Sequence, residues 1–344
     1  MKRYDFADAA KAVAIYFVIV GHAVSQSTSV FRFLFAFHMP FFFFISGYCM
    51  SENSLAADFG TFVKRRAKKL LIPYALFAVA GFIIMAVFDS WKPGLSPFEF
   101  AMKYVYYTQP PALGQTWFLV ALLVTSVLFY CAYRFAFHAR GKARFIRYGA
   151  AMLLFAFLGA IVLEKVNVPR FGRLPWKADT ALTAVVFMMA GHAVGKTGFP
   201  GKTGMPLRLV LTLILPFIVW AAAVKGNGYV NICDCIYGNV LLYYTGAVAG
   251  CLWVCLLGKW LEKVRWVRWL GRNSMPIFGI HSFVLWAWIR VYCKLITHVD
   301  EEHPAVSVFT LLIIPVLAYA CSALSVPVYG KIMGFLTERK TKEN

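Results

Sequence analysis

Residues 6–50 of the chain read FADAAKAVAIYFVIVGHAVSQSTSVFRFLFAFHMPFFFFISGYCM, and this stretch decides the fold. It consists of two apolar runs separated by a short polar turn at residues 25–30. Each run approaches the roughly 20 residues that a helix needs to cross about 30 Å of hydrocarbon. Pro40 removes a backbone donor from the second run, which predicts a kink near His38. The stretch therefore predicts two membrane-spanning helices, the second of them kinked.

The rest of the chain continues this pattern. Its 344 residues are 60% hydrophobic and 17% aromatic, with a mean hydropathy of +0.67, which excludes a soluble domain with a polar surface. The gaps at residues 51–69 and 89–114 are the size of loops. We expect an all-α integral membrane protein, a single domain over residues 1–344 that forms a bundle of about ten transmembrane helices. The predicted spans lie near residues 6–25, 31–50, 70–88, 114–136, 147–163, 180–195, 207–224, 239–257, 274–296 and 305–326.

The distribution of charge predicts the orientation. Of the 35 lysines and arginines, 24 lie at the N-terminus or in every second segment after it, 10 lie in the alternate segments, and Lys11 lies within the first span. By the positive-inside rule both termini are cytoplasmic, in a multi-pass protein of the cell (inner or plasma) membrane. The acidic run at residues 300–303 falls on the predicted outer side. The net charge of +20 sits in short clusters between apolar runs, so the lipid bilayer and not nucleic acid is the expected partner.

Three ionisable residues stand out in the first two spans: Lys11, His22 and His38. A charged or titratable group is costly inside a membrane and by default marks a function. The residues alone leave a second interpretation open, in which Lys11 extends to the near interface and each histidine only satisfies a neighbouring polar group.

Short motifs along the chain resemble those of the acyltransferase-3 family. These motifs are Asp8-x-x-Lys11, Gly21-His22, Phe37-His38-Met39-Pro40, Phe44-Ile45-Ser46-Gly47, a basic cluster closing in Leu70-Leu-Ile-Pro-Tyr74, Trp117-Phe118-Leu119, and Gly271-Arg-Asn-Ser274 to His281. They are densest over residues 6–74 and return over residues 271–284. The family consists of multi-span enzymes that move acyl groups, commonly acetyl from acetyl-CoA, onto hydroxyls of sugars and cell-envelope glycans.

The resemblance implies roles for particular residues. Lys11-x10-His22 matches the Arg-or-Lys-x10-His pattern of the family's first helix, so His22 is the expected general base, a task for which histidine suits neutral pH. His38, in the Phe-His-Met-Pro motif, is expected to position or share the proton. We assign substrate binding to Ser46, Trp117, Ser274 and His281.

The donor is expected on the basic side. Acetyl-CoA is predicted as a co-substrate, with no bound cofactor and no metal, and its phosphates are assigned to Lys11, Arg65, Arg66 and Lys69. The family's Arg-x-x-Arg appears here as Arg66-Ala67-Lys68-Lys69, so the last position keeps its charge and loses the forked geometry of arginine. Asp8 lies about 21 Å along the helix from His22, which disfavours a Ser-His-Asp arrangement and predicts an Asp8–Lys11 pair instead.

Other functions stay open at this point. A transporter or flippase of a lipid-linked sugar is the main alternative, and an acyltransferase with a non-sugar acceptor shares the same chemistry. Most of the eight cysteines are expected to act as small hydrophobes, while Cys233, Cys235 and Cys293 could form a disulfide. We expect the remaining histidines at positions 138, 192, 298 and 303 to be loop or interfacial residues.

Overall fold

The computed structural model describes residues 4–87, 94, 96–159, 173–294, 307 and 309–338. This part of the chain is helical throughout, with no strand and one isolated bridge between Asn231 and Ile236. The all-α prediction is therefore confirmed. The α-helices are α1 (Asp5–Ala23), α2 (Ser29–Phe35), α3 (His38–Tyr48), α4 (Glu52–Ala56), α5 (Phe59–Val87), α6 (Pro97–Val105), α7 (Trp117–Phe137), α8 (Ala143–Phe157), α9 (Ala178–Thr197), α10 (Met205–Val219), α11 (Val240–Leu261), α12 (Arg265–Arg272), α13 (Ser274–Tyr292), α14 (Ile314–Ala323) and α15 (Ser325–Glu338). Short 3-10 and π segments join them at η2 (Pro111–Thr116), η4 (Pro175–Lys177), η5 (Trp220–Asn227), η6 (Ile232–Asp234) and η8 (Phe309–Ile313).

Nine helical stretches in the described part of the chain are long and apolar enough to cross a membrane. They agree with nine of the ten predicted spans, and together they make the chain a multi-pass membrane protein. The remaining prediction, residues 147–163, falls on α8 and continues into residues outside the described ranges. α7 ends beside α4, where Tyr133 bonds Glu52, and α9 begins beside η6, where Thr180 bonds Ile232. This is the geometry expected if the chain crosses the membrane between α7 and α9.

The third span begins earlier than its predicted start at residue 70. Residues 51–69, expected to be a loop, form α4 and the first turns of α5. The carboxylate of Asp58 accepts a hydrogen bond from the Thr61 N–H at 2.9 Å and so caps the helix start. Hydrogen bonds from the Thr61 side chain and from its N–H lower the pKa of Asp58. The basic cluster at residues 64–69 therefore lies on a helix, and the helical period decides which of these cations share a face.

The second predicted span is broken, as expected, but at Phe37 and not at the proline. Phe37 has φ −135° and ψ −16°, outside helical values, and separates α2 from α3. Pro40 stands in the first turn of α3, where its missing N–H would have had no partner within the helix. His38 is consequently the first residue of a new helix.

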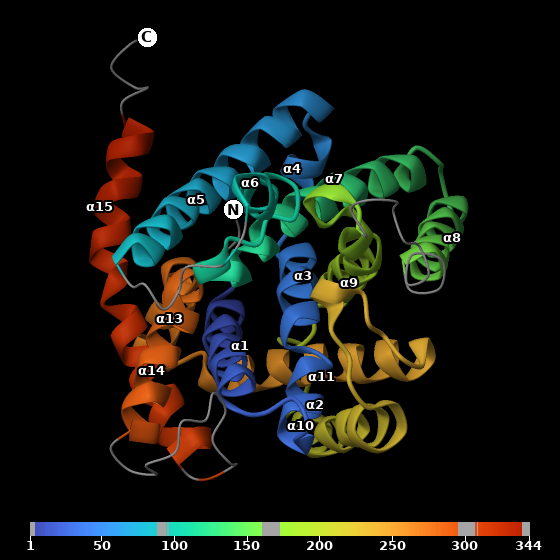
Figure 1. Ribbon diagram of the computed structural model, residues 1–344. Coiled ribbons are helices and arrows are strands. Elements are labelled where there is room, and N and C mark those ends of the chain that lie inside the picture. Colours follow the sequence, from blue (N-terminus) through green and yellow to red (C-terminus); the bar gives the residue numbers. More distant parts are fainter. Residues whose placement is uncertain are drawn as a thin grey trace.

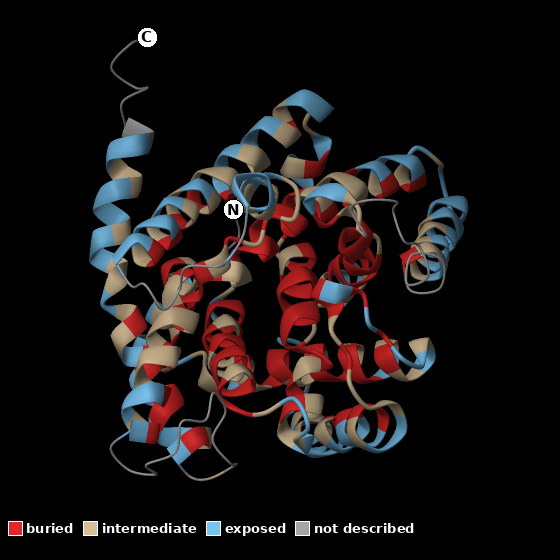
Figure 2. Cartoon of the chain, viewed as in Figure 1, coloured by how far each residue is buried: buried red, intermediate tan, exposed pale blue. Residues whose placement is uncertain are grey.

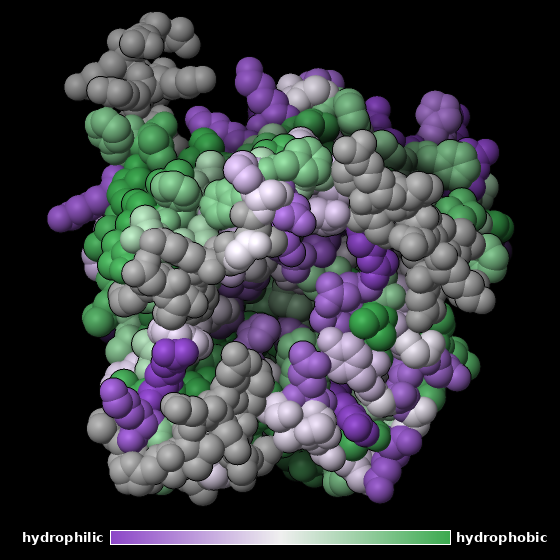
Figure 3. Space-filling view, viewed as in Figure 1, coloured by the Kyte–Doolittle hydropathy of each residue, from purple (hydrophilic) through white to green (hydrophobic). Residues whose placement is uncertain are grey.

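The helices pack around a buried centre. Figure 1 shows α1 and α3 in the middle of the bundle, and Figure 2 shows that buried residues concentrate there and in α9 and α11. α3 and α9 approach closely because glycines face each other's backbone: a Cβ on Gly47 would overlap the Met188 carbonyl, and one on Gly191 the Phe44 carbonyl. Hydrophobic residues cover the flank formed by α5 and α15, where Val79 and Phe335 are exposed to the lipid (Figure 3).

Segments predicted to share one side of the membrane do share one face. Arg268 of α12 binds Asp5 at the start of α1, and Lys196 at the end of α9 binds Glu52 of α4. On the opposite face, Tyr106 donates to the Arg173 carbonyl and Lys177 to the Cys233 carbonyl, so three predicted outer segments contact one another. Which face is cytoplasmic rests on the charge distribution alone.

Candidate functional site

Three histidines from three different helices meet inside the bundle. The ring centroid of His22, in the last turn of α1, lies 6.4 Å from that of His38 on α3 and 5.6 Å from that of His281 on α13. His38 is 3% exposed and His281 is fully buried. The sequence placed His22 and His38 in the same half of the membrane, and the fold sets His22 between His38 and the third histidine, His281.

Backbone carbonyls orient two of these rings. Nδ1 of His38 lies 2.9 Å from the Leu34 carbonyl oxygen, and Nδ1 of His281 lies 2.7 Å from the Phe278 carbonyl oxygen. A carbonyl oxygen only accepts, so each Nδ1 carries the hydrogen. In the neutral rings Nε2 then holds a lone pair, and a carbonyl that fixes the tautomer in this way prepares an imidazole to accept a proton at Nε2. The break at Phe37 leaves the Leu34 carbonyl accessible to His38.

Two of the histidines, His22 and His38, border a cavity of about 330 Å³, which we call the histidine chamber. His22, His38 and Trp117 line it together with the polar residues Gln109, Gln115, Asn231, Asp234 and Ser282. Gln115 is held in place because its Nε2 donates to the Gly279 carbonyl at 2.8 Å. Among the described lining residues there is no lysine or arginine. The chamber can therefore hydrogen-bond a polar, uncharged molecule beside two imidazoles.

Two further cavities, of about 260 and 300 Å³, share the lining residues Lys11, Ile45, Ser46, Arg66 and Lys69, and together we call them the basic chamber. Arg65 lines the first, and Arg272 and Ser274 line the second. All four cations assigned to the donor are thus gathered around one space. Residues 62, 65, 66 and 69 of α5 follow the i, i+3, i+4, i+7 spacing of one helix face, which is why Lys64 and Lys68 of the same cluster are absent from the lining.

An ion-pair network anchors the basic chamber to α1. Lys11 Nζ lies 3.5 Å from Asp8 Oδ1, which confirms the predicted pair. Arg272 adds two contacts that the sequence analysis missed, Nε to Asp8 Oδ2 at 3.1 Å and Nη2 to Asp5 Oδ1 at 3.3 Å. The Gly271–Ser274 motif could have marked Arg272 as a candidate site residue, although not its contact with Asp8. Arg272 is a fifth cation in the lining of this chamber.

The residues assigned to the substrate do not form one group. Trp117 lines the histidine chamber, while Ser46 and Ser274 line the basic chamber. His281 lines neither cavity and packs behind His22, although its neighbour Ser282 reaches the histidine chamber with Oγ 3.3 Å from the His281 Nε2. Asp234 and Gln115, which the sequence analysis did not assign to the site, lie beside Trp117 in the same lining.

The structure also locates His192 and the eight cysteines. His192, expected to be a loop or interfacial residue, lies near the end of α9, which continues to Thr197, and is 4% exposed against the rings of Phe129 and Tyr133, each 5.4 Å away. The eight cysteines, Cys233, Cys235 and Cys293 among them, lie in the described part of the chain and form no disulfide. Within the described ranges no set of three or more histidine, cysteine, aspartate or glutamate side chains is arranged to hold a metal ion.

Cys233 is the one thiol that lines the histidine chamber. Burial raises the pKa of this thiol to about 12, the lysine at position 177 opposing that shift without cancelling it. The thiolate is the nucleophilic form of cysteine. Cys233 is therefore protonated at neutral pH and unsuited to form an acyl-cysteine intermediate.

Comparison with known families places the chain in a class. The model of the acyltransferase-3 family, described as an acyltransferase domain, matches residues 4–329, and the chain belongs to this family. It is accordingly a membrane acyltransferase, and this membership favours the enzyme over a transporter of a lipid-linked sugar. Comparisons with curated proteins and with solved structures give no match.

Proposed function

We propose that the protein transfers an acetyl group from acetyl-CoA to a hydroxyl of a sugar in a cell-envelope glycan, with His22 as the general base. The observation that carries this proposal is the separation of two chambers along one helix. Lys11 lines the basic chamber and His22 the histidine chamber, eleven residues apart on α1, which is about 16 Å at 1.5 Å per residue.

The basic chamber suits the donor. CoA carries several phosphates, and Lys11, Arg65, Arg66, Lys69 and Arg272 supply five cationic groups around connected cavities. Arg272 is held in place by Asp5 and Asp8, so little side-chain freedom is lost when it binds an anion. With the N-terminus in the cytoplasm, this chamber opens on the side where acetyl-CoA is made, and the pantetheine arm extends towards the histidines.

The chemistry in the histidine chamber is a direct transfer. The acceptor oxygen attacks the thioester carbonyl carbon while the imidazole of His22 takes the hydroxyl proton. The carbon–sulfur bond then breaks, and the imidazolium returns the proton to the CoA thiolate, so the products are an ester and free CoA. The His38 ring lies close enough to stabilise the positive charge of the His22 imidazolium and to hold that ring in position. The Nδ1–H of His38 itself donates to the Leu34 carbonyl.

The lining of the histidine chamber favours a neutral sugar hydroxyl as acceptor. Gln109, Gln115, Asn231 and Asp234 offer amide and carboxylate groups that bond hydroxyls, and Trp117 offers an aromatic face. No lysine or arginine among the described lining residues stands ready to bind an anionic acceptor. A small amine is the second acceptor class compatible with Asp234.

The proposal is tested by incubating the purified protein with radiolabelled acetyl-CoA and a cell-envelope glycan extract. We expect label to move into a glycan ester that mild base releases. An acid-stable, base-resistant product would indicate an amide and therefore an amine acceptor. Label that stays on CoA with every acceptor fraction would contradict the proposed function.

A further inference from the structure

The basic and histidine chambers adjoin each other on the same four helices, where residues close in sequence line one or the other. α1 gives Ile15 to the basic chamber and Val18 to the histidine chamber, α3 gives Phe42 and Met39, and α7 gives Phe118 and Trp117. Phe278 on α13 lines both. The two spaces are therefore separated by a layer of side chains and not by a helix.

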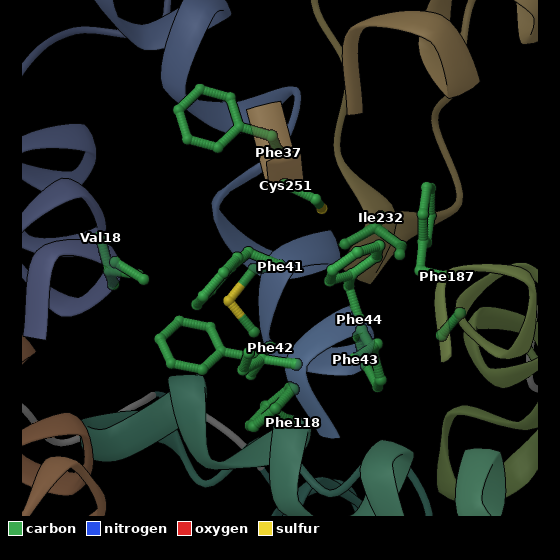
Figure 4. Close-up of a cluster of buried hydrophobic side chains, with 14 of the residues drawn as sticks. Val18, Phe37, Phe41, Phe42, Phe43, Phe44, Phe118, Phe187, Ile232 and Cys251 are labelled. Carbon is green, nitrogen blue, oxygen red and sulfur yellow. The ribbon is translucent and has the colours of Figure 1, made fainter. Parts of the chain in front are cut away.

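Three phenylalanines form that layer. The ring centroids of Phe118 and Phe278 lie 5.5 Å apart, those of Phe42 and Phe118 lie 5.7 Å apart, and those of Phe42 and Phe278 lie 6.4 Å apart. Each ring comes from a different helix, and all three residues are at most 8% exposed. Figure 4 shows Phe42 of α3 and Phe118 of α7 next to each other. Rings in mutual contact across α3, α7 and α13 close the direct path between the chambers.

We propose that Phe42, Phe118 and Phe278 are an apolar gate that the acyl-bearing arm of the donor passes and that keeps water out of the path of the thioester. The inference rests on the proposed acetyl transfer. Phosphates cannot enter a constriction made only of aromatic rings without losing their hydration, whereas an uncharged thioester on a narrow chain can. Aromatic side chains can turn aside to admit such a chain, which then fills the opening itself.

A gate of this kind would protect the thioester from hydrolysis. The imidazole that removes a proton from a sugar hydroxyl can remove one from water. Water would attack the thioester carbon, the carbon–sulfur bond would break, and acetate and free CoA would form without any transfer. Excluding water from the reacting thioester suppresses this side reaction. The three phenylalanines are therefore specificity-determining residues that favour the acceptor over water.

The test compares acetyl transfer with acceptor-independent hydrolysis of acetyl-CoA in three purified variants: Phe118→Leu, Phe278→Leu and Phe43→Leu. Leucine keeps each position apolar but leaves the gate open to water. Phe43 is the matched control, since its ring lies 5.0 Å from Phe118 and it is fully buried, yet it lines neither chamber. Phe278→Trp, which keeps an aromatic ring at the gate, is the conservative rescue variant, and Phe42→Leu replaces a leucine variant that does not fold.

We expect the ratio of hydrolysis to transfer to rise roughly tenfold in Phe118→Leu and Phe278→Leu and to stay near that of the wild type in Phe43→Leu and Phe278→Trp. An unchanged ratio in both gate variants, with the wild type transferring acetyl normally, would overturn the gate and leave the proposed function intact. A rise in Phe43→Leu as large as in the gate variants would also overturn it, because general loosening of the core would then explain the effect. A wild type that transfers no acetyl would contradict the proposed function, and the gate with it.

Discussion

Lys11 and His22 stand on the same helix and line different cavities, and Phe278, whose ring lies 5.5 Å from that of Phe118, lines both. One helix thus reaches both ends of the proposed reaction path. A substitution at either end of α1 should therefore change the kinetics with one substrate and leave the binding of the other unchanged.

Neutralising a cation of the basic chamber should weaken donor binding more than chemistry. In Arg66→Gln we expect the KM for acetyl-CoA to rise about tenfold while kcat stays within a few-fold, because a contact made equally in the ground and transition states appears in KM. The defect should grow with salt, which screens the remaining charges. Lys68→Gln is the control, since Lys68 belongs to the same cluster but lies outside the chamber, against Leu71 and Leu336. A fall in kcat at saturating donor with unchanged KM would remove Arg66 from the donor site.

Asp234 should affect the acceptor. Its side chain lines the histidine chamber and accepts a hydrogen bond from Asn231 Nδ2 at 2.7 Å. Asp234→Asn should raise the KM for the acceptor by a factor of about 10 to 150, the range of one lost charge-assisted hydrogen bond, and leave the KM for acetyl-CoA unchanged. Glu99→Gln, on the exposed surface of α6, provides a carboxylate control outside the chamber. Equal effects of Asp234→Asn on both substrates would indicate a structural role.

The thiol of Cys233 should resist alkylation in the folded protein. A folded pKa of about 12 against the usual value near 9 leaves roughly a thousandth of the thiolate that an unfolded chain has at pH 8. Mass spectrometry after iodoacetamide treatment should find Cys233 unmodified at pH 8, increasingly modified as the pH rises, and fully modified when the protein is first unfolded in detergent and denaturant. Rapid modification of folded protein at pH 8 would show that burial does not protect this thiol.

Reporter fusions test the orientation that the charge distribution predicts. Fusions after Arg140, Lys202 and Lys263 should report a cytoplasmic location, and a fusion after Gly228 should report an exterior one. The first three positions end or follow segments that lie on the face of Asp5 and Glu52. The reverse pattern would place the basic chamber outside and separate it from cytoplasmic acetyl-CoA.

Much of this architecture could be predicted from the sequence because a bilayer imposes it. Apolar length gives the spans, Pro40 predicts a broken second helix, and the i, i+3 spacing of Asp8 and Lys11 predicts their pair. The predicted start of the third span, at residue 70, was wrong. Hydropathy marks where a helix enters the lipid, whereas α5 itself begins at its cap near Asp58.

The arrangement of the site depended on contacts between distant residues. Nothing in the sequence shows that His281 packs against His22, that Arg272 reaches Asp8, or that Ser46 and Trp117 line different cavities. His192 lies near the end of an apolar run and was expected in a loop or at the interface, whereas packing against Phe129 and Tyr133 buries it within α9. Helix periodicity predicts on which face of a helix a residue lies, but it does not predict which other helix packs against that face.

The most direct test of the central claim is the rate of acetyl transfer by His22→Ala, measured beside the wild type with labelled acetyl-CoA and a glycan acceptor. Loss of a general base typically lowers such rates 10²- to 10⁴-fold, so we expect a fall of about that size in an inserted, monodisperse protein whose affinity for acetyl-CoA is unchanged. Turnover close to that of the wild type would contradict the assignment of His22 and move the chemistry to His38 or His281.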